Sequence, residues 1–359
     1  MRLLAVTIVV LGIAIWSASA VAAPTPPKQP QKGPGGFDYK HRAATMASYG
    51  TGADGYWIYR PAEPAPKTAP VVVLLHGWGG MDPVSYGGWI DHLARKGNIV
   101  IFPRYQASLM TPASEMSANA LKAVQSALAK LDEGPIKLQP GNFAIIGHSL
   151  GGVIAANLAC DAAEGKLPQP KALVLVEPSD SKNSTAAAAY GQSDAVPSIL
   201  RDYSAIPSDT LLLCIVGKDD KIVGSVAARN IFYRATKIPG ENKDFATVVT
   251  DRRGSPQLIA DHFAPLSPDE RYREEKRSRL RDRLRDKFGK ELAVAAFMEN
   301  ATTNALDYYC FWKLSDALIA AAFYGEYRDY ALGCGYDQTF MGKWSDGVPV
   351  AQLEVTKTP

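Results

Sequence analysis

One serine has a glycine two positions before it and another two positions after it, a pattern that favours nucleophilic chemistry. Residues 147–151 read Gly-His-Ser-Leu-Gly, with Ser149 at the centre and Gly152 directly after them. An apolar run precedes this motif and a run of small apolar residues follows it. Glycines two positions on either side of a serine allow a sharp turn from a strand into a helix, and this turn exposes the hydroxyl group. The pattern predicts that Ser149 is a nucleophile.

A serine hydroxyl is a weak nucleophile and needs a neighbouring base. The chain has five histidines. His41 lies near the N-terminal Pro-rich segment, His92 falls within a predicted helix, and His148 is fixed beside the nucleophile with its ring directed elsewhere. His76 precedes the serine and is expected to support its own loop. His262 follows the last predicted strand of the central run. In one hydrolase fold the nucleophile comes first along the chain and the histidine comes last. His262 is therefore the predicted base.

The third member of such a site is a carboxylate that orients the histidine. Residues 217–223 read Gly-Lys-Asp-Asp-Lys-Ile-Val and follow an apolar run. The Gly-x-x-Asp-x-x-Val frame selects Asp220, while Asp219 is expected to cap the turn. Glu177 comes directly after the apolar run at residues 172–176 and stays an alternative.

The negative oxygen that forms during acyl transfer needs two fixed donors. The backbone N–H of Leu150, at the start of the predicted helix, is one candidate. The second is expected from residues 76–80, His-Gly-Trp-Gly-Gly, where we choose the backbone N–H of Trp78. We also expect the indole of Trp78 and the side chain of His148 to contact the substrate.

Taken together, four motifs resemble those of the α/β-hydrolase superfamily. They are residues 76–80, residues 147–152, residues 217–223 and the sequence Asp-His-Phe-Ala-Pro at 261–265. The resemblance covers about residues 50–265 and is closest to dienelactone-hydrolase-like, chlorophyllase-like and cutinase-like esterases. It implies a serine hydrolase that cleaves carboxylic esters through an acyl-enzyme, with neither a metal nor an organic cofactor.

Strand-like and helix-like segments alternate along the chain, which predicts a doubly wound, mostly parallel sheet flanked by helices, the α/β-hydrolase fold. Ligands of such sheets bind at the carboxyl ends of the strands, where all four motifs fall. The predicted helix at 114–131 has Ser114 as its expected cap. The predicted strands are 55–60, 71–75, 98–102, 143–146, 172–176, 211–216 and 245–249, and the other predicted helices are 86–95, 150–164, 226–235 and 305–322.

The domain organisation follows from composition and length. Residues 23–38 are rich in Pro and Gly, which indicates a linker. Residues 39–359 form the predicted α/β-hydrolase domain. Residues 267–292 are dense in charge with one narrow apolar stripe, which predicts a helical insertion on the surface. The stretch between Glu177 and residue 211 is too short for a large lid domain, so we expect an open site.

The N-terminus has the features of a signal peptide at residues 1–22. Arg2 precedes a long apolar run, and small residues fit cleavage after Ala20 or Ala22. An uncleaved membrane anchor is the alternative. Cleavage predicts a secreted or periplasmic protein without stable membrane insertion.

Export places the four cysteines in an oxidising compartment. We expect a disulfide between Cys310 and Cys334, and buried thiols at Cys160 and Cys214. No Cys or His pair has the spacing of a metal site.

Composition is that of an ordinary globular protein, with 47% apolar and 21% charged residues. The net charge of +3 gives no indication of a nucleic-acid partner. We expect a small-molecule or polymeric ester as substrate, while the sequence gives no oligomeric state. The alternatives are an acyltransferase with the same three residues, a peptidase, and a non-catalytic secreted binding protein on a hydrolase scaffold.

Overall fold

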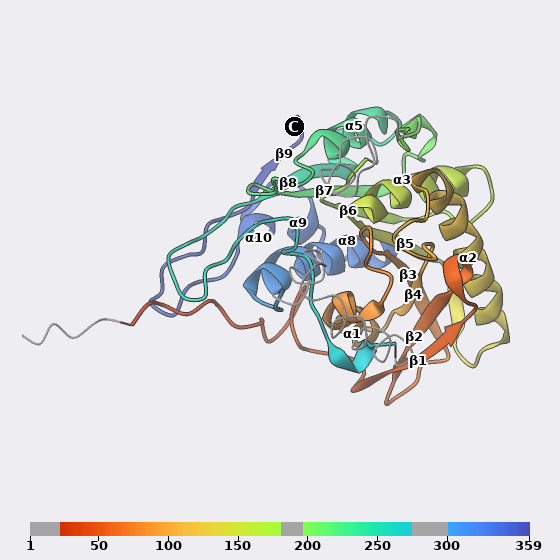
Figure 1. Cartoon of the computed structure of the whole chain (residues 1–359). Helices are drawn as coiled ribbons and strands as arrows, with labels where there is room; N and C mark the ends of the chain where they lie inside the picture. Colours follow the sequence, from red (N-terminus) through yellow and green to blue (C-terminus); the bar gives the residue numbers. More distant parts are fainter. Residues whose placement is uncertain (1–21, 181–196, 275–300) are drawn as a thin grey trace, which may run out of the picture.

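The structure, a computed structural model, describes residues 22–180, 197–274 and 301–359. Nine strands in these ranges form one sheet in the order β1-β2-β4-β3-β5-β6-β7-β8-β9 (Figure 1). The six strands from β4 to β8 in this order run parallel, while β1, β2 and β9 pair antiparallel at the two edges. The strands are β1 Ala43–Tyr49, β2 Tyr56–Ala62, β3 Thr68–Leu75, β4 Ile99–Pro103, β5 Lys137–His148, β6 Ala172–Val176, β7 Leu211–Gly217, β8 Lys243–Val248 and β9 Glu354–Thr356.

Helices cover both faces of this sheet, which confirms the predicted doubly wound α/β architecture (Figure 1). Helices α2, α3 and α5 pack on one face, and α1 and α8 pack on the other. The helices of the described ranges are α1 Gly87–Arg95, α2 Ala113–Glu133, α3 Leu150–Ala163, α5 Val226–Arg234, α8 Trp312–Tyr324, α9 Arg328–Ala331 and α10 Tyr336–Thr339.

Strand β3 shows why the central strands are continuously apolar. Val71, Val73 and Leu75 belong to the core on the α2–α3 side, while Val72 and Leu74 belong to the core on the α1–α8 side. Successive side chains of a strand point to opposite faces, so a strand covered on both faces needs apolar residues at every position. The carboxyl ends of the parallel strands meet at one edge of the sheet, and there the predicted motifs converge.

The predicted strands and the predicted helices outside the charged insertion occur with shifted ends, while β1, β9, α9 and α10 were not predicted. Strands β1 and β9 were not predicted, because β1 is largely solvent-accessible and has no apolar run, and β9 has only three residues. The prediction of Ser114 as a helix cap is wrong, since α2 already begins at Ala113 after Pro112. The predicted helix at 305–322 begins with a π-helical turn over Asp307–Phe311.

The segment predicted as a linker lacks helices and strands but is attached to the domain. The Pro24 carbonyl accepts a hydrogen bond from Ser255 N–H at 2.9 Å. Gly35 N–H donates to Asp316 Oδ2 at 2.9 Å, and Tyr309 donates its hydroxyl proton to the Lys28 carbonyl at 3.1 Å. A free linker is therefore the wrong description, because its backbone satisfies polar groups of the domain surface.

The expected disulfide is also wrong. All four cysteines are free, and Cys310 is buried in the core whereas Cys334 is exposed. Burial raises the pKa of the Cys310 thiol, which marks an inert core group. Cys160 and Cys214 are buried thiols, as predicted.

Most of the predicted charged insertion, from residue 275 onward, lies outside the described residues, as do residues 181–196 of the segment expected to leave the site open. The described part of the insertion contains a 3₁₀ turn at Glu270–Tyr272 rather than a helix. No helix in the described ranges is long and apolar enough to span a membrane.

Candidate active site

Ser149 occupies a sharp turn between β5 and α3. Its backbone has φ 56° and ψ −127°, a conformation that costs about 1–3 kcal/mol for a residue with a side chain. The turn depends on two glycines: a Cβ at Gly147 would lie 2.1 Å from the Gly151 carbonyl oxygen, and one at Gly151 would lie 2.3 Å from the His76 carbonyl oxygen. The serine is thus placed at the carboxyl edge of the sheet, next to the N-terminus of α3.

The structure brings together the three residues that the motifs singled out. Ser149 Oγ lies 2.8 Å from His262 Nε2, and His262 Nδ1 lies 2.8 Å from Asp220 Oδ2. The other oxygen of Asp220 accepts hydrogen bonds from the N–H groups of Ile222 at 2.8 Å and Val223 at 3.0 Å. Because the loop after β7 fixes the carboxylate, the carboxylate can fix the imidazole.

These contacts determine where the protons lie. Burial by itself would raise the pKa of Asp220, but the hydrogen bond and the charge of His262 outweigh it and hold that pKa below its usual range. Asp220 is therefore a carboxylate and accepts the Nδ1 proton of His262. His262 Nε2 is then left as the acceptor of the Ser149 hydroxyl proton.

Glu177, the alternative acid, lies beside this chain of contacts rather than within it. Its Oε2 is 3.5 Å from His262 Nδ1, longer than the contact with Asp220. The carboxyl is fully buried and neither oxygen has a hydrogen-bond partner of good geometry among the described residues. Burial, with the charges of Asp220 and Asp261, raises the pKa of Glu177 well above its usual range, so it is a neutral acid.

His148 is buried and both of its ring nitrogens contact protein groups, so its expected contact with substrate stays a prediction that this geometry does not favour. Tyr86 Oη accepts the Gly77 N–H at 2.8 Å and lies 2.8 Å from His148 Nδ1, so its single proton goes to that nitrogen. His148 Nε2–H then donates to the His262 carbonyl at 3.0 Å. Burial, with the nearby His262, lowers the pKa of His148 from 6.5 to about 3, so the ring is neutral.

Tyr86 was not predicted as a site residue, because it belongs to none of the motifs. It lies in a 3₁₀ turn at Pro83–Tyr86 that leads into α1. Through Tyr86 and His148, the loop after β3 is connected to the backbone of His262 by an unbroken series of hydrogen bonds. Only the folded arrangement shows this connection.

The loop after β3 lies directly against the nucleophile. A Cβ at Gly77 would be 3.1 Å from Ser149 Cβ. Gly79 N–H donates to Gln106 Oε1 at 2.9 Å, and Gly80 N–H donates to the Gly77 carbonyl at 3.0 Å. Trp78 is partly buried against the core. The loop is therefore a rigid turn with backbone groups beside the serine.

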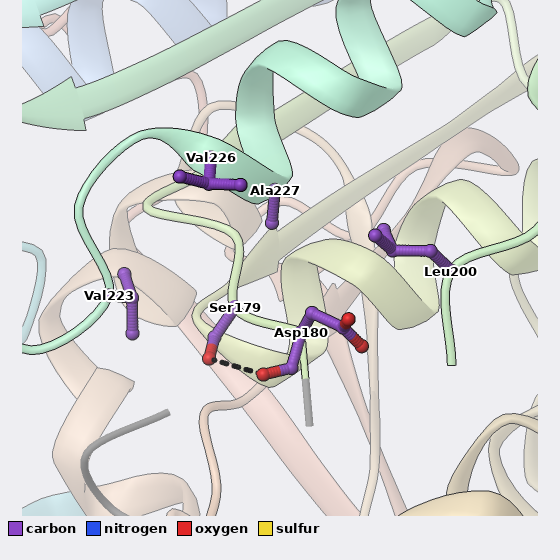
Figure 2. A pocket seen from close by; sticks show the side chains of 6 residues that line it. All are labelled: Ser179, Asp180, Leu200, Val223, Val226 and Ala227. Carbon is purple, nitrogen blue, oxygen red and sulfur yellow. Dashed lines mark hydrogen bonds between the residues drawn. The ribbon is translucent and has the colours of Figure 1, made fainter. Parts of the chain in front are cut away.

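A hollow lies between the loop after β6 and the start of α5 (Figure 2). It is a small depression, part of which is open to solvent. Ser179 borders it and donates its backbone N–H to the Ser149 carbonyl at 2.9 Å, which places the hollow near the nucleophile. The lining is mixed in polarity, and its residues are Ser179, Asp180, Leu200, Val223, Val226 and Ala227.

One group of side chains in the described ranges has the donor types of a metal site. His148, Glu177 and His262 each place one ligand atom within 4.8 Å of the others. His262 Nδ1 is committed to Asp220, and His148 Nε2 is committed to the His262 carbonyl. A cation here would have to break both contacts, so the arrangement fits proton transfer better than metal binding.

Comparison with family models identifies the class of this fold. A model for the alpha/beta hydrolase fold matches residues 72–209, which include the loop after β3 and Ser149. No curated protein is similar enough in sequence to be matched. With the mostly parallel sheet and its flanking helices, the match supports the α/β-hydrolase fold, a fold of hydrolases.

Proposed function

We propose that this protein is an exported serine hydrolase that cleaves carboxylic esters, with Ser149 as nucleophile, His262 as base and Asp220 as the acid that orients the base. The observation that carries the proposal is the pair of 2.8 Å contacts from Ser149 Oγ to His262 Nε2 and from His262 Nδ1 to Asp220 Oδ2. The strained backbone of Ser149 supports it, since strain of this kind concentrates at active sites.

In the proposed mechanism, Ser149 Oγ attacks the ester carbonyl carbon while its proton passes to His262 Nε2. The carbonyl oxygen becomes negative and is held by the backbone N–H groups of Leu150 and Trp78. His262 then gives its proton to the departing alcohol, which leaves an acyl group on Ser149.

The second half of the cycle returns the enzyme to its starting state. A water molecule gives a proton to His262 Nε2 and attacks the acyl carbon. The carboxylic acid leaves as Ser149 Oγ takes this proton back. Asp220 stays ionised throughout and stabilises the positive charge on His262.

The aliphatic lining of the small hollow supports a substrate that places an apolar group against it. Its aliphatic side chains come from Leu200, Val223, Val226 and Ala227, and Ser179 and Asp180 border it (Figure 2). We expect one arm of a small-molecule or polymeric ester to enter here, since apolar pockets with few polar groups favour such ligands.

Turnover of an ester panel graded by acyl length tests this function. Ser149→Ala is expected to keep the fold and lose at least ~1000-fold in kcat, because the nucleophile of an acyl-transfer mechanism is removed. Ser225→Ala, at the half-buried start of α5, is the matched control and should keep full turnover. Near-normal turnover by Ser149→Ala would refute the assignment.

Product identity separates hydrolysis from acyl transfer. With an alcohol offered beside water, a hydrolase yields mainly free acid, whereas an acyltransferase yields mainly the new ester.

Export is tested separately by the N-terminal sequence of the mature protein, which we expect to begin at residue 21 or 23.

A further inference from the structure

The feature that the proposed mechanism leaves unused is the ring of His76, directly after β3. The ring is fully buried. Its Nδ1 lies 2.6 Å from the Gly77 carbonyl oxygen, and its Nε2 lies 2.7 Å from the Arg104 carbonyl oxygen. Carbonyl oxygens only accept hydrogen bonds, and a neutral imidazole has a single N–H. A neutral ring would set one nitrogen lone pair against a carbonyl at hydrogen-bond distance, whereas a doubly protonated ring satisfies both contacts.

The surroundings of His76 also suit a cation. The ring stacks on Tyr105 with centroids 4.1 Å apart and planes 7° from parallel, and Phe102 lies 5.4 Å away at 28°. Aromatic faces attract a positive charge, and desolvation strengthens this attraction. A buried charge without compensation costs several kcal/mol, but here two carbonyl dipoles and two aromatic faces offset that cost.

The backbone and the hydroxyl of Tyr105 fix its aromatic face against His76. Its backbone has φ 36°, an uncommon conformation for a residue with a side chain, and its hydroxyl donates to the His76 carbonyl. Burial and the nearby His262 are the main causes of the lowered pKa of His148, and a charge on His76 acts in the same direction.

The peptide that accepts from His76 Nδ1 is the one that carries the proposed donor to the oxyanion. The Gly77 carbonyl and the Trp78 N–H belong to the same planar trans peptide group, so they point in opposite directions. A carbonyl directed at His76 therefore directs the Trp78 N–H away from it. Donation to the carbonyl polarises the peptide and strengthens its N–H as a donor, most of all when the donor is charged.

We propose that His76 is an imidazolium cation that polarises the Gly77–Trp78 peptide and thereby strengthens the binding of the oxyanion by the Trp78 N–H. His76 is a positioning residue in this account, since it acts on the reacting atoms only through the peptide. The effect on catalysis rests on the proposed ester hydrolysis, whereas the charge on His76 does not.

The charge is measured directly by ¹⁵N NMR of the mature full-length protein labelled at histidine, at pH 7, with His76→Asn used to assign the resonances. Both ring nitrogens of His76 are expected to be protonated, whereas His148 should show one protonated and one bare nitrogen. A bare nitrogen on His76 overturns the proposal, and this result needs no enzyme activity.

The catalytic effect is measured with His76→Gln, which keeps one neutral donor and removes the charge. Weakening one donor of an oxyanion site is expected to lower kcat about tenfold with KM nearly unchanged, a part of the roughly 10²- to 10³-fold lost when a donor is removed. The affinity for a boronic acid that forms a tetrahedral adduct should fall by a similar factor.

His92→Gln is the matched control, because His92 is also buried and hydrogen-bonded but lies in α1 between Tyr39 and Asp316. It should keep both kcat and the boronic acid affinity. If folded His76→Gln keeps the kcat of the wild type, the polarising role is refuted and only a structural role stays. If the wild type cleaves no ester, the proposed function fails and the NMR result still decides the charge.

Discussion

At the scale of single residues, the site contains two neighbouring carboxyl groups with different protonation states. Asp220 is a carboxylate because it is hydrogen-bonded, and Glu177 is a neutral acid because it is buried without a partner of good geometry. The backbones of Tyr105, Ser149 and Glu177 all have positive φ, and all three lie within two residues of the end of a parallel strand. Half of the six non-glycine positions with positive φ in the described residues therefore lie at the edge of the sheet where the proposed chemistry occurs.

Glu177→Gln tests the neutral state of this acid through the pH dependence of stability. In the unfolded chain the carboxyl ionises above its ordinary pKa of 4.5, while the folded protein keeps the proton. The wild type therefore loses stability as pH rises above about that value, and the glutamine variant avoids this loss. In thermal unfolding, the melting temperature of the variant minus that of the wild type should be more favourable at pH 8 than at pH 4. An equal difference at both pH values would contradict the claim that Glu177 is a neutral acid in the folded protein.

Asp220→Asn and Glu177→Gln together decide which acid orients His262. Asp220→Asn should lower kcat by roughly 10³- to 10⁴-fold, because the imidazole loses the acceptor that fixes its tautomer. Glu177→Gln should keep most of the turnover, and Asp219→Asn, at the neighbouring half-buried position, serves as control. A larger loss from Glu177→Gln than from Asp220→Asn would transfer the role to Glu177.

At the scale of elements, the parallel strands were the most predictable part of the chain. Their continuous apolar runs follow from burial on both faces, and the loops after them were correctly singled out because such loops meet at one edge. The contacts of Tyr86 and Glu177 were not predictable, since they depend on how α1 and β6 sit beside β5. The hydrogen bonds of His148 were not predictable either, because a position in the chain next to a nucleophile does not say which way a ring points.

Helix α8 offers a test of element packing away from the site. Lys313 is buried in α8 and donates to the carbonyl oxygens of Asp337 at 3.1 Å, Gln338 at 2.8 Å and Phe340 at 2.6 Å, which holds α10 against the helix. Burial lowers the pKa of this amine to about 8.

Replacement of Lys313 by methionine leaves three carbonyl groups without a donor. Lys313→Met should therefore reduce the free energy of unfolding by about 2–4 kcal/mol, measured with urea, and leave KM unchanged. Lys122→Met, at an exposed ion pair on α2, should change it by less than about 1 kcal/mol. Equal effects of the two variants would show that the contacts of Lys313 contribute no more than a surface pair.

At the scale of the whole molecule, the segment before β1 belongs to the folded body. Its backbone reaches the loop after β8 at Ser255, helix α8 at Asp316 and the C-terminal region at Ser345. Composition alone indicated a linker, because Pro and Gly residues carry little apolar surface. The stabilising contacts come from backbone groups, which composition does not report.

Removal of residues 24–36 should lower the melting temperature by several degrees, because at least five hydrogen bonds to the domain are lost at about 0.5–1.5 kcal/mol each. A protein that begins at residue 24, and so loses only exposed residues before the segment, is the control and should melt like the mature wild type. An unchanged melting temperature would restore the description of this segment as a free linker.

The central claim is that Ser149 is the activated nucleophile, and covalent labelling with a fluorophosphonate followed by mass spectrometry of the digested protein tests it most directly. The probe should attach to the peptide that contains Ser149 in the wild type, and labelling should be lost in Ser149→Ala and strongly slowed in His262→Gln. A wild-type protein that stays unlabelled, or a label that attaches to another residue and persists in Ser149→Ala, would contradict the account.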